Sequence, residues 1–189
     1  MFVCFIGLGL VIYASKRDER NAFAPASKPY SSARGAGELT GRIVAIADGD
    51  TVTLLGEHNE QYKIRVAGID APEKKQAFGT RAKEKMSQLV YGKPVTVEWK
   101  KRDMYGRIIG KIFVASGECR VSSCLKNIDV GLNQIENGLA WHYKQYEKEQ
   151  SAADRVAYAN AEVDARSKKI GLWSENNPIP PWEFRHKKR

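Results

Sequence analysis

The chain has 189 residues, enough for one domain with a hydrophobic core, and its 42% hydrophobic and 28% charged residues are ordinary for a globular protein. With 31 Lys and Arg against 22 Asp and Glu, the formal net charge of +9 favours a polyanionic partner, either nucleic acid or an anionic membrane surface. No cluster of His and Cys has the spacing of a zinc site, which excludes a zinc centre of that kind.

The N-terminal segment is apolar. Residues 1–14 contain no charged side chain, and charged residues follow from Lys16 to Arg20. Because this run is shorter than the roughly 20 residues of a spanning helix, residues 1–15 are predicted to be a signal peptide or a signal anchor. The alternative is a mis-assigned start or a cytosolic tail, since no Lys or Arg precedes the run and the Ile12-Tyr13-Ala14 site is poor. We expect an extracytoplasmic protein, secreted or periplasmic, with transient membrane association through this segment.

Two cysteines would remain after cleavage of a signal peptide. Cys4 would be removed, whereas Cys119 and Cys124 would stay in a stretch that contains Ser and Gly. An oxidising compartment permits a disulfide between them. Two free thiols are the alternative, because the distance and orientation of the two cysteines decide whether a disulfide forms, and a sequence does not show them.

A linker precedes the first predicted strands. Residues 16–40 are rich in Ser, Ala, Gly, Lys and Arg without periodicity, which indicates a flexible linker. The folded domain is therefore expected over residues 41–175. Its first strands are predicted at residues 41–47, 51–55 and 61–69, with an Asp48-Gly49 turn between the first two.

A helix and two more strands follow. Residues 76–91 carry apolar side chains at helical spacing, residues 95–100 alternate between apolar and polar, and residues 108–114 form a fifth strand. Ile128, Leu132, Ile135 and Leu139 predict a second helix.

Residues 151–169 predict a third helix. Beyond it, Pro178, Pro180 and Pro181 are expected to preclude regular structure, so residues 176–189 are predicted to be a basic tail. Five short strands, a helix between the third and fourth, and two later helices predict an α+β protein built on an OB-fold five-stranded β-barrel with three helices. This fold often binds oligonucleotides, but a fold alone does not fix a function.

Three acidic residues lie at the ends of predicted strands. Asp50 belongs to the turn between the first two strands, and Asp70 and Glu73 flank Pro72 after the third. Asp and Gly are common in turns, so a solvated turn is one interpretation. Carboxylates that converge on one cation are the other, and such hard oxygen ligands suit Ca²⁺ or Mg²⁺ rather than zinc.

Two arginines accompany these acids. Arg65 lies within an apolar strand and needs a partner, which a structural salt bridge would also provide. Strict alternation places Arg65 and Asp70 on opposite faces of a strand, so a shared site requires a break, for which Gly68 is the natural place. Arg107 follows the Tyr105-Gly106 turn. Guanidinium groups at such positions can bind phosphate oxygens bidentately.

The motifs together resemble a known family. A-D-G-D-T-V, I-R-V-A-G-I-D-A-P-E, D-M-Y-G-R and N-G-L-A-W, in this order, are similar to the thermonuclease (staphylococcal nuclease-like) family over residues 41–173, and the closing P-P-W-E-F-R resembles a tail of bacterial members. The resemblance implies a monomeric, calcium-dependent nuclease with endo- and exonucleolytic activity. It would hydrolyse DNA and RNA with little sequence preference, leave 3′-phosphate ends, and need no protein partner.

The resemblance also assigns roles to residues. Asp50 and Asp70 would be calcium ligands, Ala71 would ligate through its backbone carbonyl, and Glu73 would orient or deprotonate the attacking water. Arg65 and Arg107 would bind the phosphate and act in catalysis.

Tyr105, Tyr143 and Tyr146 would contact the substrate, because aromatic faces stack on bases without reading sequence. Packing within the domain is the alternative for Tyr143 and Tyr146. Their spacing departs from the family pattern by one residue. His142 is predicted to be a surface or packing residue.

Two other functions compete with the nuclease. A non-catalytic OB-fold module would bind nucleic acid without cleaving it, but the presence of all five acidic and basic site residues counts against it. A membrane-tethered basic protein would use the apolar N-terminus, but it gives no reason for the acidic motifs. Calcium-dependent cleavage of a plain oligonucleotide would distinguish the enzyme from the binding module.

Overall fold

The computed structural model describes residues 36–117 and 123–187. The predicted signal segment, nearly all of the predicted linker, and Cys119 lie outside these residues. Cys124 is disulfide-bonded, and both other cysteines of the chain lie outside the described part. Within the described ranges, no helix combines the length and apolarity needed to cross a bilayer.

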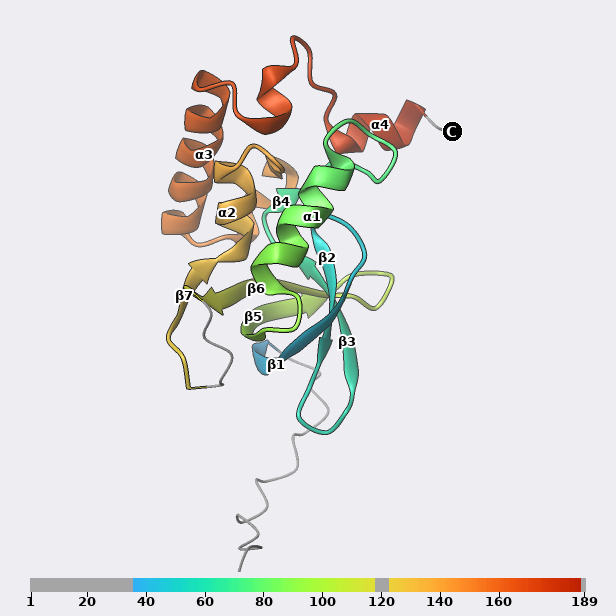
Figure 1. The fold of residues 1–189 in the computed structure, drawn as a ribbon, viewed down its shortest axis with the longest axis vertical. Coiled ribbons are helices and arrows are strands. Elements are labelled where there is room, and N and C mark those ends of the chain that lie inside the picture. Colours follow the sequence, from blue (N-terminus) through green and yellow to red (C-terminus); the bar gives the residue numbers. More distant parts are fainter. Residues whose placement is uncertain (1–35, 118–122, 188–189) are drawn as a thin grey trace, which may run out of the picture. The chain divides into compact units, whose positions relative to one another are not determined.

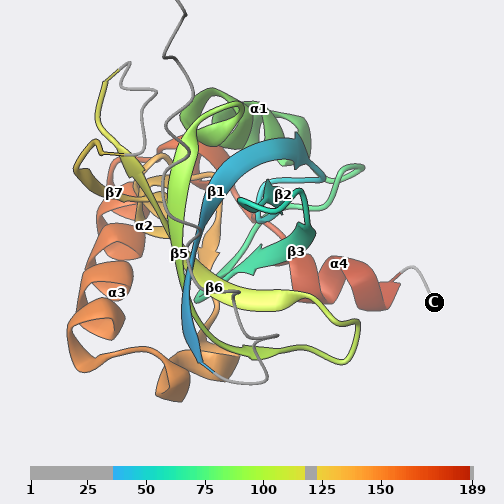
Figure 2. The ribbon, with the colours of Figure 1, turned by 90° about the horizontal axis from the view of Figure 1, so that it is seen from below.

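Five strands close into a barrel, as predicted. The sheet runs in the order β3-β2-β1-β5-β6, and a parallel pairing of β3 with β6 closes it. Figure 2 shows β1 curving between β2 and β5. The strands are β1 (Gly37–Ile46), β2 (Thr51–Leu55), β3 (Gln61–Val66), β5 (Pro94–Arg102) and β6 (Ile108–Ala115), with β7 (Lys126–Asp129) added beside β6. The predicted α+β OB-fold is confirmed.

The first strand starts earlier than expected. β1 begins at Gly37 rather than Gly41, and its first residues pair with β5, Gly37 opposite Trp99. Leu39 is buried in the core. The predicted linker therefore overlaps the barrel at its end, because pairing with a distant strand orders residues whose local sequence indicates none.

The third predicted strand is broken. β3 ends at Val66, and the chain turns at Gly68, whose φ of 77° suits glycine. β4 (Ile69–Asp70) then leaves the barrel and pairs with β8 (Trp141–His142). The break predicted at Gly68 is confirmed.

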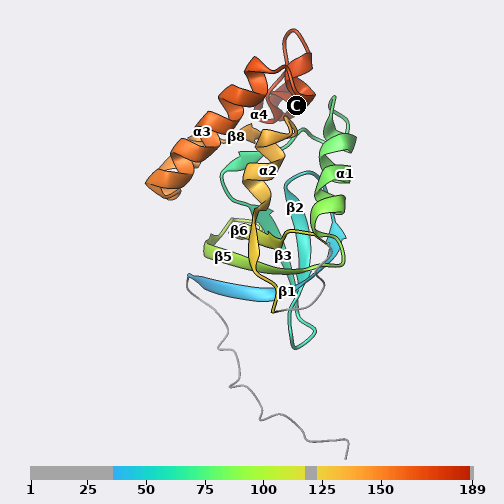
Figure 3. The ribbon, with the colours of Figure 1, turned by 60° about the vertical axis from the view of Figure 1, so that its left-hand side comes forward.

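Helices lie beyond one end of the barrel, while the β2–β3 hairpin points away from them (Figures 1 and 3). They are α1 (Gly79–Val90), α2 (Val130–Glu136), α3 (Ala152–Ser167) and α4 (Pro181–Lys187), with 3₁₀ turns at η1 (Lys144–Glu149) and η2 (Gly171–Ser174).

Two helix predictions need correction. Ile128 belongs to β7, where it pairs with Val114, and Asp129 caps α2 by accepting hydrogen bonds from the backbone of Gly131 and Leu132. The expectation of an irregular C-terminal tail is also wrong. Pro181 begins α4, because proline is well tolerated in the first turn of a helix.

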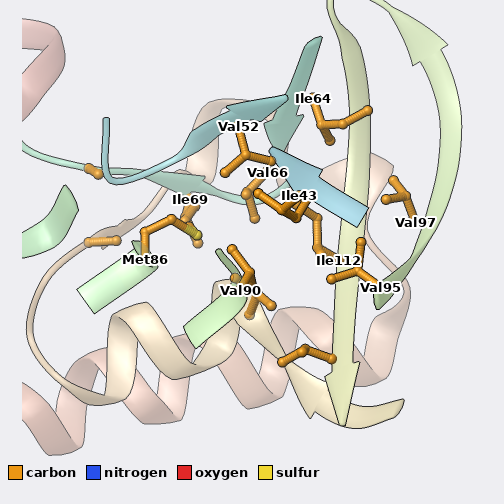
Figure 4. Packing of buried hydrophobic residues seen from close by; sticks show 14 of the residues in the cluster. Ile43, Val52, Ile64, Val66, Ile69, Met86, Val90, Val95, Val97 and Ile112 are labelled. Carbon is orange, nitrogen blue, oxygen red and sulfur yellow. The ribbon is translucent and has the colours of Figure 1, made fainter. Parts of the chain in front are cut away.

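The core fills the barrel and the space beneath α1. Val95, Val97 and Trp99 are buried and alternate with more exposed residues, as predicted. Figure 4 shows Met86 and Val90 of α1 directed at barrel residues such as Ile43. This packing fixes α1 against the end of the barrel where β1 turns into β2.

A charged cluster joins the barrel to α3. Lys111 Nζ lies 2.6 Å from Asp154 Oδ1 and 3.1 Å from Asp129 Oδ2. The hydroxyl of Tyr158 donates to both oxygens of Asp129. Strands β6 and β7 and helix α3 are thereby linked through one lysine.

Replacing Lys111 with methionine should lower the free energy of unfolding at pH 7 by about 1 kcal/mol, since both carboxylates lose their partner. Burial raises the pKa of Asp154, but the hydrogen bonds from Lys111 and Ser151 and the charges of Lys111 and Lys100 together outweigh it, so the pKa lies below its ordinary value. Such a carboxylate stabilises the fold above its unfolded pKa, and the effect is lost as pH falls through the folded pKa. Urea unfolding should show a difference at pH 7 that is smaller at about pH 3, which lies below the ordinary carboxyl pKa. An equal difference at both pH values would contradict this account.

Candidate active site

The turn that carries Asp50 is fixed from two sides. A Cβ on Gly49 would lie 2.6 Å from the Cβ of Ala82 and 2.7 Å from that of Ala71, so only glycine fits where the turn meets α1. Gln134 of α2 is fully buried and donates to the carbonyls of Gly49 (2.8 Å) and Ala82 (2.9 Å). Asp50 therefore projects from a rigid turn. Gln134 is a positioning residue that sequence reasoning missed, although a glutamine beside the apolar positions of a predicted helix was a signal for it.

Two buried carboxylates meet at one guanidinium. Asp50 is 3% exposed and Asp70 0%. Arg65 donates from Nη1 to Asp50 Oδ1 and from Nη2 to Asp70 Oδ1, both at 2.8 Å. Asp50 also accepts from the Thr51 hydroxyl and from the Ala71 amide, each at 2.9 Å. The structure thus brings Asp50, Arg65 and Asp70 together.

The break at Gly68 makes this meeting possible. Beyond it, Asp70 pairs with Trp141 in the β4–β8 ribbon. The Gly68 carbonyl accepts from the Tyr143 amide at 2.9 Å, which extends the ribbon. The turn at Gly68 interrupts the alternation of side chains along the strand. Asp70 can therefore meet Arg65 on the same side.

Burial is the largest single influence on the pKa of Asp50 and on that of Arg65, but only for Asp50 does it set the net direction. Burial raises the pKa of Asp50 above its ordinary value, although the Arg65 charge works in the opposite direction. Burial also lowers the pKa of Arg65, but Asp50 and Asp70 raise it by more. The arginine is therefore charged and holds together two carboxylates that would otherwise repel each other.

A second guanidinium reaches the site from the C-terminus. Arg185 of α4 donates to Asp70 Oδ1 (3.2 Å), Asp70 Oδ2 (2.8 Å) and Glu73 Oε1 (2.9 Å). Burial lowers the pKa of Arg185, but the hydrogen bonds to Asp70 and Glu73 raise it by more. Sequence reasoning missed this residue, although the closing P-P-W-E-F-R motif contains it. Glu73 thus joins the site through Arg185.

Aromatic contacts hold α4 in place. The Trp182 ring lies 5.5 Å from that of Trp141 and 5.6 Å from that of Tyr143. Gln76, in the loop before α1, donates to the Ile179 carbonyl. In Figure 1, α4 lies next to this loop. The position of Arg185 is therefore set by packed elements.

Arg107 pairs with a carboxylate of its own turn, that of Asp103. Arg107 donates from Nε to Asp103 Oδ2 at 2.7 Å and from its backbone to Asp103 Oδ1 at 2.9 Å. Tyr105 is 76% exposed, with the Arg107 guanidinium over its ring. Burial raises the pKa of Asp103, but the hydrogen bonds from Arg107 lower it by more. Among the described contacts, none joins Arg107 to the acids, so its catalytic role stays a prediction.

A pocket with three aromatic residues in its lining includes the strand partner of Asp70. Its volume is about 300 Å³, and Trp141, the strand partner of Asp70, lines it together with Tyr143 and Trp182. Burial, and to a smaller extent the Asp70 charge, raise the pKa of Tyr143. Tyr146 packs edge-on to Tyr143 at 5.5 Å and is half exposed. Both tyrosines thus pack within the domain and also offer exposed surface.

His142 is a packing residue, as predicted. It is buried, its Nε2 lies 2.8 Å from Gln150 Oε1, and its ring lies edge-on to Tyr158.

The residues of the site fit a hard divalent cation. Asp50 and Asp70 offer carboxylate oxygens, and with Glu73 they outnumber the two guanidinium groups by one negative charge. Among residues 36–117 and 123–187, no three acidic, His or Cys side chains are grouped as a metal site. A cation would therefore complete its shell with backbone carbonyl groups and water, as calcium commonly does.

An OB-fold barrel that carries buried acids and guanidinium groups has the groups needed to bind a phosphodiester and to stabilise charge during its cleavage. A family model described as staphylococcal nuclease homologue matches residues 63–175. The chain belongs to this family and is a nuclease, as predicted.

Its relatives include an uncharacterized endonuclease of Haemophilus influenzae, 38% identical over 79% of this chain and 75% of the relative. An uncharacterized endonuclease of Escherichia coli is 38% identical over 80% of this chain and 88% of the relative. A micrococcal nuclease of Shigella flexneri is 35% identical over 78% and 81%.

Proposed function

We propose that this nuclease is calcium-dependent and hydrolyses phosphodiester bonds in both DNA and RNA with little sequence preference, leaving 3′-phosphate ends. The observation that carries the proposal is the pair of buried carboxylates, Asp50 and Asp70, bridged by Arg65 at 2.8 Å on each side. With Glu73, these carboxylates carry one negative charge more than Arg65 and Arg185 neutralise, and this excess favours a divalent cation at the site. The name of the Shigella flexneri relative, a micrococcal nuclease, supports the same activity.

Each residue has a role in this reaction. A bound calcium ion, held by Asp50, Asp70 and the Ala71 carbonyl, would supply Lewis-acid charge beside the phosphate. Arg65 holds the acids in place, and its charge stabilises the negative charge that develops on the phosphate oxygens. Glu73, at the exposed rim, accepts a proton from the attacking water. The phosphorus–5′-oxygen bond breaks, the 5′-oxygen takes a proton from solvent, and the phosphate stays on the 3′-oxygen.

Two further groups would hold the substrate. Arg107 directly precedes Ile108, which pairs with Ile64 beside Arg65, so its backbone lies next to the strand that carries the bridging arginine. After release from Asp103, its guanidinium would bind phosphate. The pocket of Trp141, Tyr143 and Trp182 would stack a base, which explains low sequence preference because every base has an aromatic face.

Hydrolysis of single-stranded DNA and of RNA by the full chain tests the proposal. We expect cleavage with calcium, loss of cleavage with a chelator, recovery on adding calcium back, and 3′-phosphate ends on the products. Glu73→Gln should lower turnover by roughly 10²-fold, since the water loses its base. Salt-sensitive DNA binding without cleavage would instead identify a binding module.

We also propose an extracytoplasmic, monomeric enzyme. The disulfide at Cys124 supports an oxidising compartment. Fractionation of cells with an antibody to the protein, and light scattering of the purified chain, test these two points.

A further inference from the structure

We propose that Arg185 is a substrate-binding residue of the active site, which neutralises Asp70 and Glu73 when no cation is present and turns to the substrate phosphate when a cation takes its place. The inference rests on the proposed function. It makes the C-terminal helix α4 part of the catalytic site rather than a tail.

Arg185 is the guanidinium on the solvent side. Both terminal nitrogens of Arg65 are engaged with Asp50 and Asp70, and Arg107 is paired with Asp103. The side chain of Arg185 is 41% exposed although it touches the fully buried Asp70. An incoming phosphodiester would therefore meet Arg185 before it meets Arg65.

A cation and Arg185 compete for the same atoms. Both carboxylate oxygens of Asp70 accept hydrogen bonds from Arg185. A divalent cation on Asp70 would repel the guanidinium and weaken these bonds. Because Trp182 anchors α4 against Trp141 and Tyr143, the flexible arginine side chain moves rather than the helix.

The charges of the site then match a phosphodiester. Asp50, Asp70 and Glu73 face Arg65 and Arg185, which leaves one net negative charge. A divalent cation changes this to one net positive charge, which a single phosphodiester neutralises. Without Arg185 the same complex would keep a negative charge, so removal of Arg185 should favour the cation and disfavour the substrate.

Arg185→Gln tests both halves of the inference in the full chain. Calorimetry without substrate should show calcium binding about threefold to tenfold tighter, since the competing cation is gone. With saturating calcium, affinity for a short phosphorothioate single-stranded DNA should fall roughly tenfold, the loss of one charge-assisted contact. Arg185→Lys, which keeps the charge, should fall between this variant and the wild type on both measurements.

Lys168→Gln is the matched control. Lys168 is the C-cap residue of α3, its side chain is exposed, and its Nζ lies 3.8 Å from Asp164 Oδ2. The same loss of charge at this position should leave both affinities unchanged. Circular dichroism verifies that each variant is folded. If Arg185→Gln keeps the wild-type affinity for either calcium or the oligonucleotide, the inference is wrong. A wild-type chain that neither binds calcium nor cleaves DNA would refute the proposed function itself.

Discussion

Arg65→Ala is expected to reduce turnover of single-stranded DNA by roughly 10²-fold or more, because it removes charge that stabilises the transition state. It also leaves Asp50 and Asp70 buried without their bridge, so the fold should lose stability as well. Steady-state kinetics at saturating calcium measure the first effect, and urea unfolding measures the second.

Two further variants make this result interpretable. Arg65→Lys keeps the positive charge but cannot reach both carboxylates with a planar fork, so it should remain folded and still lose most of the activity. Lys63→Ala removes an exposed basic residue from the same strand and should leave kcat unchanged. Near wild-type rates for both Arg65 variants would overturn the assignment of the site.

Gly49→Ala is expected to lower the free energy of unfolding by about 2 to 3 kcal/mol, since the new methyl group would overlap Ala71 and Ala82. Neither neighbour can give way by changing rotamer, because each contact is to a Cβ. The turn must therefore move, and Asp50 moves with it. Calcium affinity, measured by calorimetry at a temperature where the variant is folded, should fall in parallel.

Gly37→Ala is the control for this substitution. Among the described residues, a methyl group there would meet Trp99 Nε1 alone, at 3.7 Å, which is an ordinary contact, so stability should change little. Equal stability of the Gly49 variant and the wild type would show that the turn is not fixed by this close approach.

The local patterns of the sequence predicted the barrel well. Alternation along β5 and helical spacing along α1 both reflect burial on one face, and both are confirmed. The sequence also indicated that the strand must break between Arg65 and Asp70. Strand alternation places these two residues on opposite faces, so they can share a site only if the strand is interrupted between them. Gly68 supplied that break because its backbone adopts a positive φ.

What the sequence did not reveal depends on contacts between distant segments. Arg185 meets Asp70 across most of the domain, and no local pattern encodes that contact. Pairing with Val114 overrode the helical spacing that included Ile128. Arg107 forms an ion pair with Asp103, four residues before it in the chain. This local partner was not predicted, because the acids expected near Arg107 were those of the site.

The β4–β8 ribbon fixes the spacing between Asp70 and Trp141. Asp70 and Trp141 are direct partners in it, so a carboxylate of the proposed cation site and a wall of the aromatic pocket are set one strand spacing apart by backbone hydrogen bonds. In the proposed complex, changes of side chain in the pocket would alter which bases are held, while the backbone pairing of Asp70 with Trp141 would keep the pocket next to the cation site. The enzyme would thus tolerate drift in substrate preference while the geometry of bond cleavage stays constant.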